Sequence, residues 1–125
     1  MLLVRRCDSG MWELPGGSVD VGESAVVAAV RHTIAAAGVD ILVTGIAALF
    51  TDPSHVVHSP HGEVRQEFAL LFHARSLGGV PRGDHRETID AAWVAVAELP
   101  ALPMEPSARS RIMHALDVGE PPYLG

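Results

Sequence analysis

The residues best suited to chemistry lie in one stretch, Leu14–Val39, which reads LPGGSVDVGESAVVAAVRHTIAAAGV. Gly17 belongs to a glycine pair, Glu23 follows it, and Arg31 and His32 come later in a segment without Gly or Pro. Glycines leave backbone carbonyl oxygens accessible, because no side chain covers them. A neutral imidazole binds Zn²⁺, Ni²⁺, Co²⁺ or Mn²⁺ and is a poor ligand for Mg²⁺. The stretch therefore carries groups that could hold a cation or an anion.

Other side chains able to bind anions or metals are scattered. Arg6 and Arg65 are candidate substrate-binding residues, because the forked guanidinium matches a phosphate, and a surface role is the alternative for both. His55, His58 and His61 recur at every third residue, but proline and turn-forming neighbours favour a loop. For this triplet, metal binding and a solvated loop remain alternatives.

Aromatic side chains offer a second kind of contact. Trp12 and Trp93 lie in apolar extended segments, which favours core or wall positions over platforms for a nucleobase. Phe50 and Tyr123 could stack on a base or pack inside the protein, and both alternatives stay open.

The elements that position these residues follow from hydrophobic pattern and from Gly and Pro. The pattern predicts helices over residues 24–37, with 23 as an alternative start, and 107–117. It predicts strands or extended pieces over residues 1–6, 12–17, 39–51, 63–75 and 91–96. It predicts turns, loops and a tail over residues 7–10, 52–62, 76–90 and 119–125.

Two local signals support these boundaries. Gly38 directly follows the first helix, as a C-cap should. In the segment 63–75, the side chains of Val64, Phe68, Leu70 and Phe72 share one parity, which is typical of a strand. Strands with one helix after the first pair and another at the end predict a mixed sheet covered on both faces.

Length and composition limit the function classes. The 125 residues are expected to form a single domain, 1–125, and 48% hydrophobic against 19% charged residues exclude a disordered chain. The net charge of −6 argues against general nucleic-acid binding but allows a small phosphorylated ligand met by a few Arg. One cysteine, Cys7, and the lack of a long apolar run or leader predict a cytoplasmic protein with no membrane partner.

The stretch Leu14–Val39 resembles the signature of the Nudix hydrolase superfamily. That signature is a Gly, five residues, a Glu, seven residues, then Arg-Glu-apolar-x-Glu-Glu-x-Gly-apolar. Gly17, Glu23, Arg31, Gly38 and Val39 fall on this spacing without a gap. The preceding LPGG, the strand ending in two Arg, and the later segment ELP are also similar to the family, so the resemblance covers the whole chain.

The resemblance implies a fold, a reaction and a site. The implied fold is α+β, an α/β/α sandwich around a mixed sheet. The implied activity is that of a pyrophosphohydrolase, which cleaves a phosphoanhydride in a nucleoside diphosphate linked to another group and uses Mg²⁺ or Mn²⁺. Glu87 is similar to a late acidic residue of the family. The implied catalytic residues are Glu23, Arg31 and Glu87, and the implied metal ligands are Gly17, His32 and Glu87.

The sequence departs from the family where the metal is usually held. Its three helix carboxylates are replaced by His32, Ala35 and Ala36, while Glu23 and Gly38 fix the alignment on both sides. A helix brings carboxylates at such spacing onto one patch, and an alanine side chain cannot bind a metal. Since one lost electrostatic contact commonly costs on the order of 10²–10³ in rate, we expect turnover to be weak or lost.

The start of the chain is a second departure. Members of the family usually have a strand before the one that matches residues 2–6. Either the start codon has been assigned downstream of the true one, or the sheet has lost a strand. A lost strand predicts unpaired backbone groups on a neighbouring strand and, from these, a homodimer that covers the edge.

Two functions remain open. The first is a diverged hydrolase acting on nucleoside diphosphate-linked or nucleotide pyrophosphate substrates. The alternative is a catalytically inactive nucleotide-binding or regulatory module of the same fold.

Overall fold

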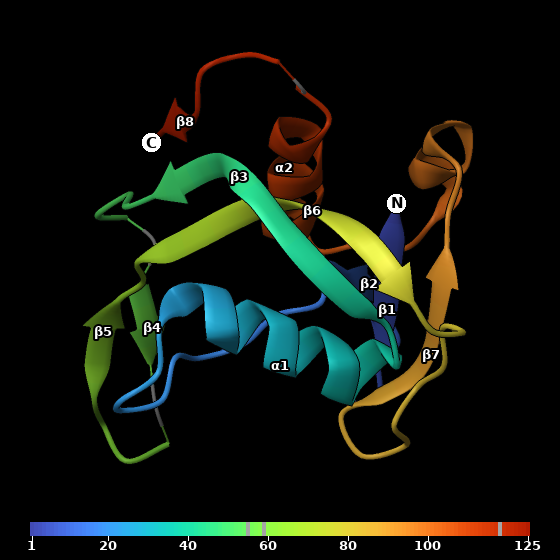
Figure 1. Ribbon diagram of the computed structural model, residues 1–125. Helices are drawn as coiled ribbons and strands as arrows, with labels where there is room; N and C mark the ends of the chain where they lie inside the picture. The colour runs from blue at the N-terminus through green and yellow to red at the C-terminus, as the bar shows by residue number, and fades with distance from the viewer. Residues whose placement is uncertain (55, 59, 118) are drawn as a thin grey trace.

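The computed structural model describes residues 1–54, 56–58, 60–117 and 119–125. The elements are β1 (Leu2–Arg6), β2 (Trp12–Glu13), α1 (Ala25–Ala37), β3 (Asp40–Phe50), β4 (Val56–His58), β5 (Val64–Gln66), β6 (Ala69–Gly78), β7 (Thr88–Trp93), a 3-10 helix η1 (Val96–Ala101), α2 (Pro106–Ala115) and β8 (Tyr123–Leu124). Figure 1 shows α1 and α2 on opposite sides of the long β3–β6 pair.

Two three-stranded sheets and one hairpin form the β part. β1 lies between β2 and β7, and both run antiparallel to it. β3 lies between β6, which is antiparallel to it, and β8, which is parallel to it. β4 and β5 pair with each other. Because α1 and α2 both contact β3 from opposite faces, the predicted α+β sandwich around a mixed sheet is confirmed (Figure 1).

Local signals define α1 at both ends. The Ser24 hydroxyl accepts a hydrogen bond from the Val27 N–H at 3.1 Å and so caps the first turn. Gly38 has a φ of 73°, and its N–H donates to the Ile34 carbonyl at 2.9 Å. A positive φ costs glycine little, which explains the residue type at this position. The predicted helix and its Gly38 cap are confirmed.

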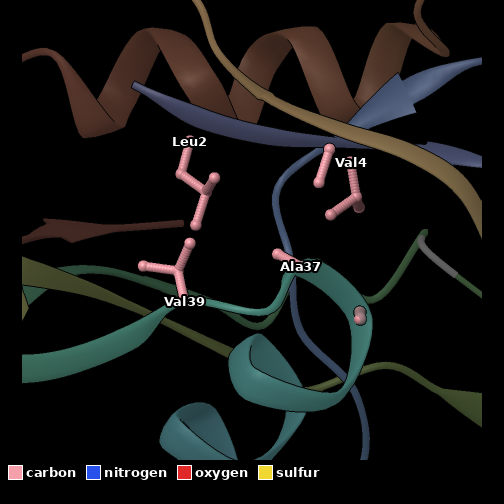
Figure 2. Packing of buried hydrophobic residues seen from close by; sticks show 6 residues of the cluster. Leu2, Val4, Ala37 and Val39 are labelled. Atoms are coloured by element: carbon pink, nitrogen blue, oxygen red, sulfur yellow. The ribbon is translucent and has the colours of Figure 1, made fainter. Parts of the chain in front are cut away.

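The core forms on both faces of β1, because successive strand residues point to opposite sides. One cluster joins β1 to the end of α1 and contains Leu2, Val4, Ala36, Ala37, Val39 and Ala91 (Figure 2). The other joins β1 to η1 and α2 and contains Leu3, Val94, Leu99 and Ile112. The small side chains of Ala36 and Ala37 let the last turn of α1 approach β1 closely.

The middle of the chain differs from the sequence prediction. The predicted loop 52–62 contains β4, and the predicted strand 63–75 is divided into β5 and β6. β5 turns back to pair with β4, with Val56 opposite Gln66 and His58 opposite Val64. Parity suggested one long strand, but Val64 and Phe68 are both exposed, so no single buried face continues through the segment.

Smaller differences follow in the second half. β6 continues to Gly78 and β7 begins at Thr88, so the predicted loop 76–90 is shorter at both ends. The predicted last strand, 91–96, ends at Trp93, and η1 follows it. The predicted helix 107–117 runs from Pro106 to Ala115. The tail forms β8, which pairs with β3 at Ala48 and Leu49.

β1 pairs with β7 along Leu2–Arg6 and with β2 only at Val4 and Arg5. A longer open edge lies on β3. Within the part of the chain that the structure describes, β8 covers that edge only at Ala48 and Leu49, so residues 40–47 pair with β6 alone. Among the described helices, none has the length and apolar character needed to cross a membrane.

Candidate functional site

Glu23 and Arg31 join the glycine-rich loop to α1. The Arg31 guanidinium donates from Nε to Glu23 Oε2 at 2.7 Å and from Nη2 to Oε1 at 2.8 Å. The Glu23 carboxylate also accepts the Asp20 N–H at 3.1 Å. Arg31 and, to a smaller extent, this N–H lower the pKa of Glu23 to about 2, and Glu23 raises the pKa of Arg31. The pair predicted as catalytic thus holds the loop against the helix.

Arg31 also reaches the middle of the loop. Its Nη2 lies 3.3 Å from Asp20 Oδ2 and donates to the Ser18 carbonyl at 3.3 Å. One guanidinium therefore contacts three positions of the loop, at Ser18, Asp20 and Glu23.

His32 contacts the same carbonyl. Its Nε2 lies 2.7 Å from Ser18 O. A carbonyl oxygen only accepts, so Nε2 must carry the hydrogen and cannot bind a metal in this arrangement. The imidazole also covers Gly17, where an added Cβ would lie 2.6 Å from both ring nitrogens. The glycine is thus required by the ring as the two are placed.

The other two altered box positions contribute no ligand. Ala35 is exposed, and Ala36 is buried in the cluster around β1. The Ala36 carbonyl accepts a buried hydrogen bond from Thr88 Oγ1 at 2.7 Å. Among the described residues, no three His, Cys, Asp or Glu side chains gather to hold a metal. This donor set lacks the oxygens that Mg²⁺ or Mn²⁺ prefers and does not fit either ion.

Glu87 lies in an ordered turn beside the end of α1. The Asp84 carboxylate accepts the N–H groups of Arg86, Glu87 and Thr88 at 2.9, 2.9 and 3.0 Å. These bonds lower the pKa of Asp84 to about 2, with that from Thr88 the largest cause. Glu87 itself is exposed, and its carbonyl accepts the Cys7 N–H at 2.8 Å. The turn is attached to α1 by the hydrogen bond from Thr88 Oγ1 to the Ala36 carbonyl, directly after Glu87.

The two predicted substrate-binding arginines differ. Arg6 donates to both carboxylate oxygens of Asp8, at 2.8 and 2.6 Å, and to Glu13 at 3.1 Å. These bonds raise the pKa of Arg6, and Arg6 lowers that of Asp8 to about 2. Arg65 is exposed on β5, opposite Val57 of β4. A phosphate at Arg6 would have to compete with two carboxylates.

The remaining candidates are the histidines in and around β4 and the two tryptophans. His58 lies on β4 and His61 in the following turn, while His55 lies outside the described residues. Trp12 packs against the core cluster of Leu3, as predicted, whereas Trp93 is 51% exposed.

An aromatic group between α2 and β8 was not predicted from the sequence. His114 stacks on Tyr123 with ring centroids 3.7 Å apart, and Phe50 lies 5.8 and 5.7 Å from these two rings. Arg111 lies over Phe50 and pairs with Glu67 at 2.9 Å. Beside them is a cavity of about 220 Å³. No spacing in the sequence connects these residues, because tertiary folding brings them together from β3, the segment between β5 and β6, α2 and β8.

A mainly apolar surface lies along the outer side of α1, formed by Val26, Val27, Val30, Arg31, Ile34 and Ala35. Helix positions that face solvent are usually polar, so this apolar surface is unusual.

The loop, the capped helix and the sandwich around a mixed sheet define the class of protein. The family described as NUDIX domain matches residues 1–116. The chain therefore belongs to the Nudix family, as the sequence predicted. Members of this family generally use divalent metal ions.

Particular relatives give the comparison detail. The chain is 34% identical over 112 residues to a protein of Bacillus subtilis strain 168 described as a putative 8-oxo-dGTP diphosphatase, covering 90% of this chain and 68% of that one. It resembles the crystal structure of an ADP-ribose pyrophosphatase from Streptococcus suis with a TM-score of 0.73 and 22% identity, covering 99% of this chain and 88% of that one. It also resembles the NUDIX domain of Shewanella oneidensis NrtR complexed with ADP ribose, with a TM-score of 0.70, 20% identity, and coverage of 91% and 73%.

Proposed function

We propose that this chain binds a nucleoside diphosphate-linked compound or a nucleotide pyrophosphate and hydrolyses it weakly or not at all. Family membership and the relatives named for 8-oxo-dGTP and ADP-ribose support the ligand class. The observation that carries the weak turnover is the His32 Nε2–H bond to the Ser18 carbonyl, at a position where the family signature has a carboxylate. Because attack on a phosphoanhydride needs the phosphoryl charge neutralised, losing this carboxylate and those at 35 and 36 slows the reaction.

The proposed roles of the chain's own residues follow from their contacts. Glu23 and Arg31 hold the loop that faces the phosphates, and Gly17 keeps that loop narrow. Glu87, exposed on its turn, is the proposed base. Arg65 is the proposed phosphate contact, and Arg6 joins it only when the ligand displaces Asp8 or Glu13. The cation at Gly17, His32 and Glu87 that the resemblance implies would require His32 to release the Ser18 carbonyl, and no step is derived through it.

The second candidate is a binding or regulatory module without turnover. The paired state of Arg31 and His32 favours it, because both side chains are used to shape the loop and neither is left for chemistry. In this case shape complementarity and arginine side chains hold the nucleotide, which binds and dissociates without being cleaved.

Turnover and binding should be measured separately on one panel. The panel contains ADP-ribose, dinucleoside polyphosphates, NADH and deoxynucleoside triphosphates, each with Mg²⁺, Mn²⁺ or Zn²⁺. Slow phosphate or nucleotide release that falls further in Glu87→Gln supports the hydrolase. Saturable binding of a panel member without release supports the module. If no panel member binds and none is cleaved, the proposed function is wrong.

Restoring the box tests the cause of weak turnover. Ala36 is buried, so a Glu there disturbs the core as well as adding a ligand. The double variant His32→Glu/Ala35→Glu should therefore be compared with the triple variant that adds Ala36→Glu. A gain in release in a variant that stays folded by circular dichroism supports the missing carboxylates as the cause. No gain in a folded triple variant means that the defect lies elsewhere.

We also propose a homodimer, which the open edge of β3 along residues 40–47 supports. Backbone N–H and C=O groups on such an edge can pair with a second copy. Light scattering should give twice the chain mass, and a monomer at all concentrations contradicts the dimer. Cytoplasmic location and lack of nucleic-acid binding remain expectations from composition.

A further inference from the structure

We infer that His32, together with Arg31, fixes the glycine-rich loop on α1 without a cation, so that the order of residues 16–24 is independent of metal. The inference concerns the site of the proposed function, but it holds whether or not a ligand is bound or cleaved. In this role His32 is a positioning residue.

Side chains of α1 attach the loop at three positions, Ser18, Asp20 and Glu23. Near its start, the Ser18 carbonyl accepts from His32 Nε2 at 2.7 Å and from Arg31 Nη2 at 3.3 Å. In its middle, Asp20 lies 3.3 Å from Arg31 Nη2. At its end, Glu23 forms two bonds with Arg31. No further ligand is needed to bridge the loop and the helix.

The charged side chains of α1 and of the loop pair with one another without a cation. Arg31 and His32 are the only titratable side chains of α1, and neither is acidic. The two acids of the loop, Asp20 and Glu23, both lie beside Arg31. Carboxylates at 32, 35 and 36 would repel one another and require a cation, whereas an imidazole and two methyl groups do not.

Gly17 supplies an independent observation. Its backbone lies outside the left-handed region that favours glycine, so conformation does not require this residue type. A Cβ there would overlap the His32 ring, whereas a Cβ on the neighbouring Gly16 would have no atom within 4 Å. As the two residues are placed in this chain, a side chain at 17 would therefore collide with the imidazole, which covers this part of the backbone.

The first test is the response of the melting temperature to metal. We expect Mg²⁺ or Mn²⁺ to change the Tm of the ligand-free wild-type protein by less than about 1 °C relative to EDTA, whereas an ion at about 100 times its Kd would raise Tm by roughly 10 °C. Fast proteolysis or amide exchange of residues 16–24 in EDTA that slows on adding metal would overturn the inference. A metal-induced rise in Tm that is lost in His32→Ala would overturn it as well.

The second test separates the hydrogen bond from simple packing. Nitrogen NMR should show His32 with hydrogen on Nε2, and His32→Ala should speed amide exchange in the loop by at least 10-fold. His32→Gln keeps an N–H donor and should restore part of the protection, whereas His32→Phe keeps the ring size and should not. Equal protection in Gln and Phe variants, or hydrogen on Nδ1 alone, contradicts the role of the Ser18 bond.

The third test uses the two glycines. Gly17→Ala should lower Tm in the wild-type background, and the loss should shrink when His32→Ala is present. Gly16→Ala is the matched control and should leave Tm unchanged in both backgrounds. The same loss from Gly17→Ala with and without His32 would mean that the ring does not set the residue type at 17.

Discussion

The two sides of α1 are attached to the molecule in different ways. Toward the glycine-rich loop, Arg31 and His32 make polar contacts at a surface that is largely exposed. Toward β1, the last turn is buried: Ala37 is fully buried, and the Ala36 carbonyl is bonded to Thr88. Polar surface contacts can be exchanged for others at small cost, whereas close packing restricts residue size.

This difference divides the three altered box positions into two groups. Positions 32 and 35 belong to the accessible side, where an imidazole and a methyl group have replaced carboxylates. Position 36 belongs to the buried side and is now part of the core. The three positions have therefore changed in two different ways. Carboxylates can be restored at 32 and 35 on the accessible side, but not at 36 without disturbing the core.

The largest expected effect is that of Ala36→Glu. It places a carboxylate in the cluster of Leu2, Val4 and Ala91, and an unpaired buried charge should cost about 3 kcal/mol or more of the free energy of unfolding. Ala35→Glu, one residue away on the exposed side, should change it by less than about 0.5 kcal/mol. Urea unfolding measures both values, and equal costs would remove the distinction between the two sides.

Thr88→Val should have the next largest effect. Valine keeps the shape of threonine but leaves the buried Ala36 carbonyl without the 2.7 Å hydrogen bond, which should cost about 1–3 kcal/mol. Thr44→Val, on the exposed surface of β3, is the control and should lie within about 0.5 kcal/mol of wild type. If both valine variants unfold at the same urea concentration, the end of α1 is not fixed through Thr88.

Parts of this molecule that depend on near neighbours in sequence could be predicted. Ser24 and Gly38 act within one turn of α1, and the eight-residue spacing of Glu23 and Arg31 carries a pair that the structure forms. The hairpin of β4 and β5 could not be predicted, because its strands have only three residues each and show no alternation of apolar and polar residue types.

The contacts that define the site needed the fold. The partner of His32 is a backbone carbonyl, at Ser18, which has no residue-type signal. Thr88 reaches Ala36 across 52 positions of sequence, and Asp84 acts by accepting backbone N–H groups. Sequence identified which ligands were missing from the box, and it could not show what had replaced them.

The smallest expected effect is on the pH dependence of stability, which Glu23 affects on the loop side of α1 and Asp84 on the buried side. Glu23 and Asp84 both have a folded pKa of about 2, below ordinary values of 4.5 and 3.8, so each stabilises the fold above its ordinary pKa. Both contributions are lost as pH falls toward 2. The pKa of Glu23 is lowered chiefly by Arg31, in an exposed ion pair that salt screens, whereas the pKa of Asp84 is lowered by backbone N–H groups.

We expect the drop in urea midpoint between pH 5 and pH 2.5 to become shallower in both Glu23→Gln and Asp84→Asn. High salt should reduce only the difference between wild type and Glu23→Gln. Equal salt sensitivity of the two differences would mean that one electrostatic mechanism, rather than two, holds the loop and the turn on α1.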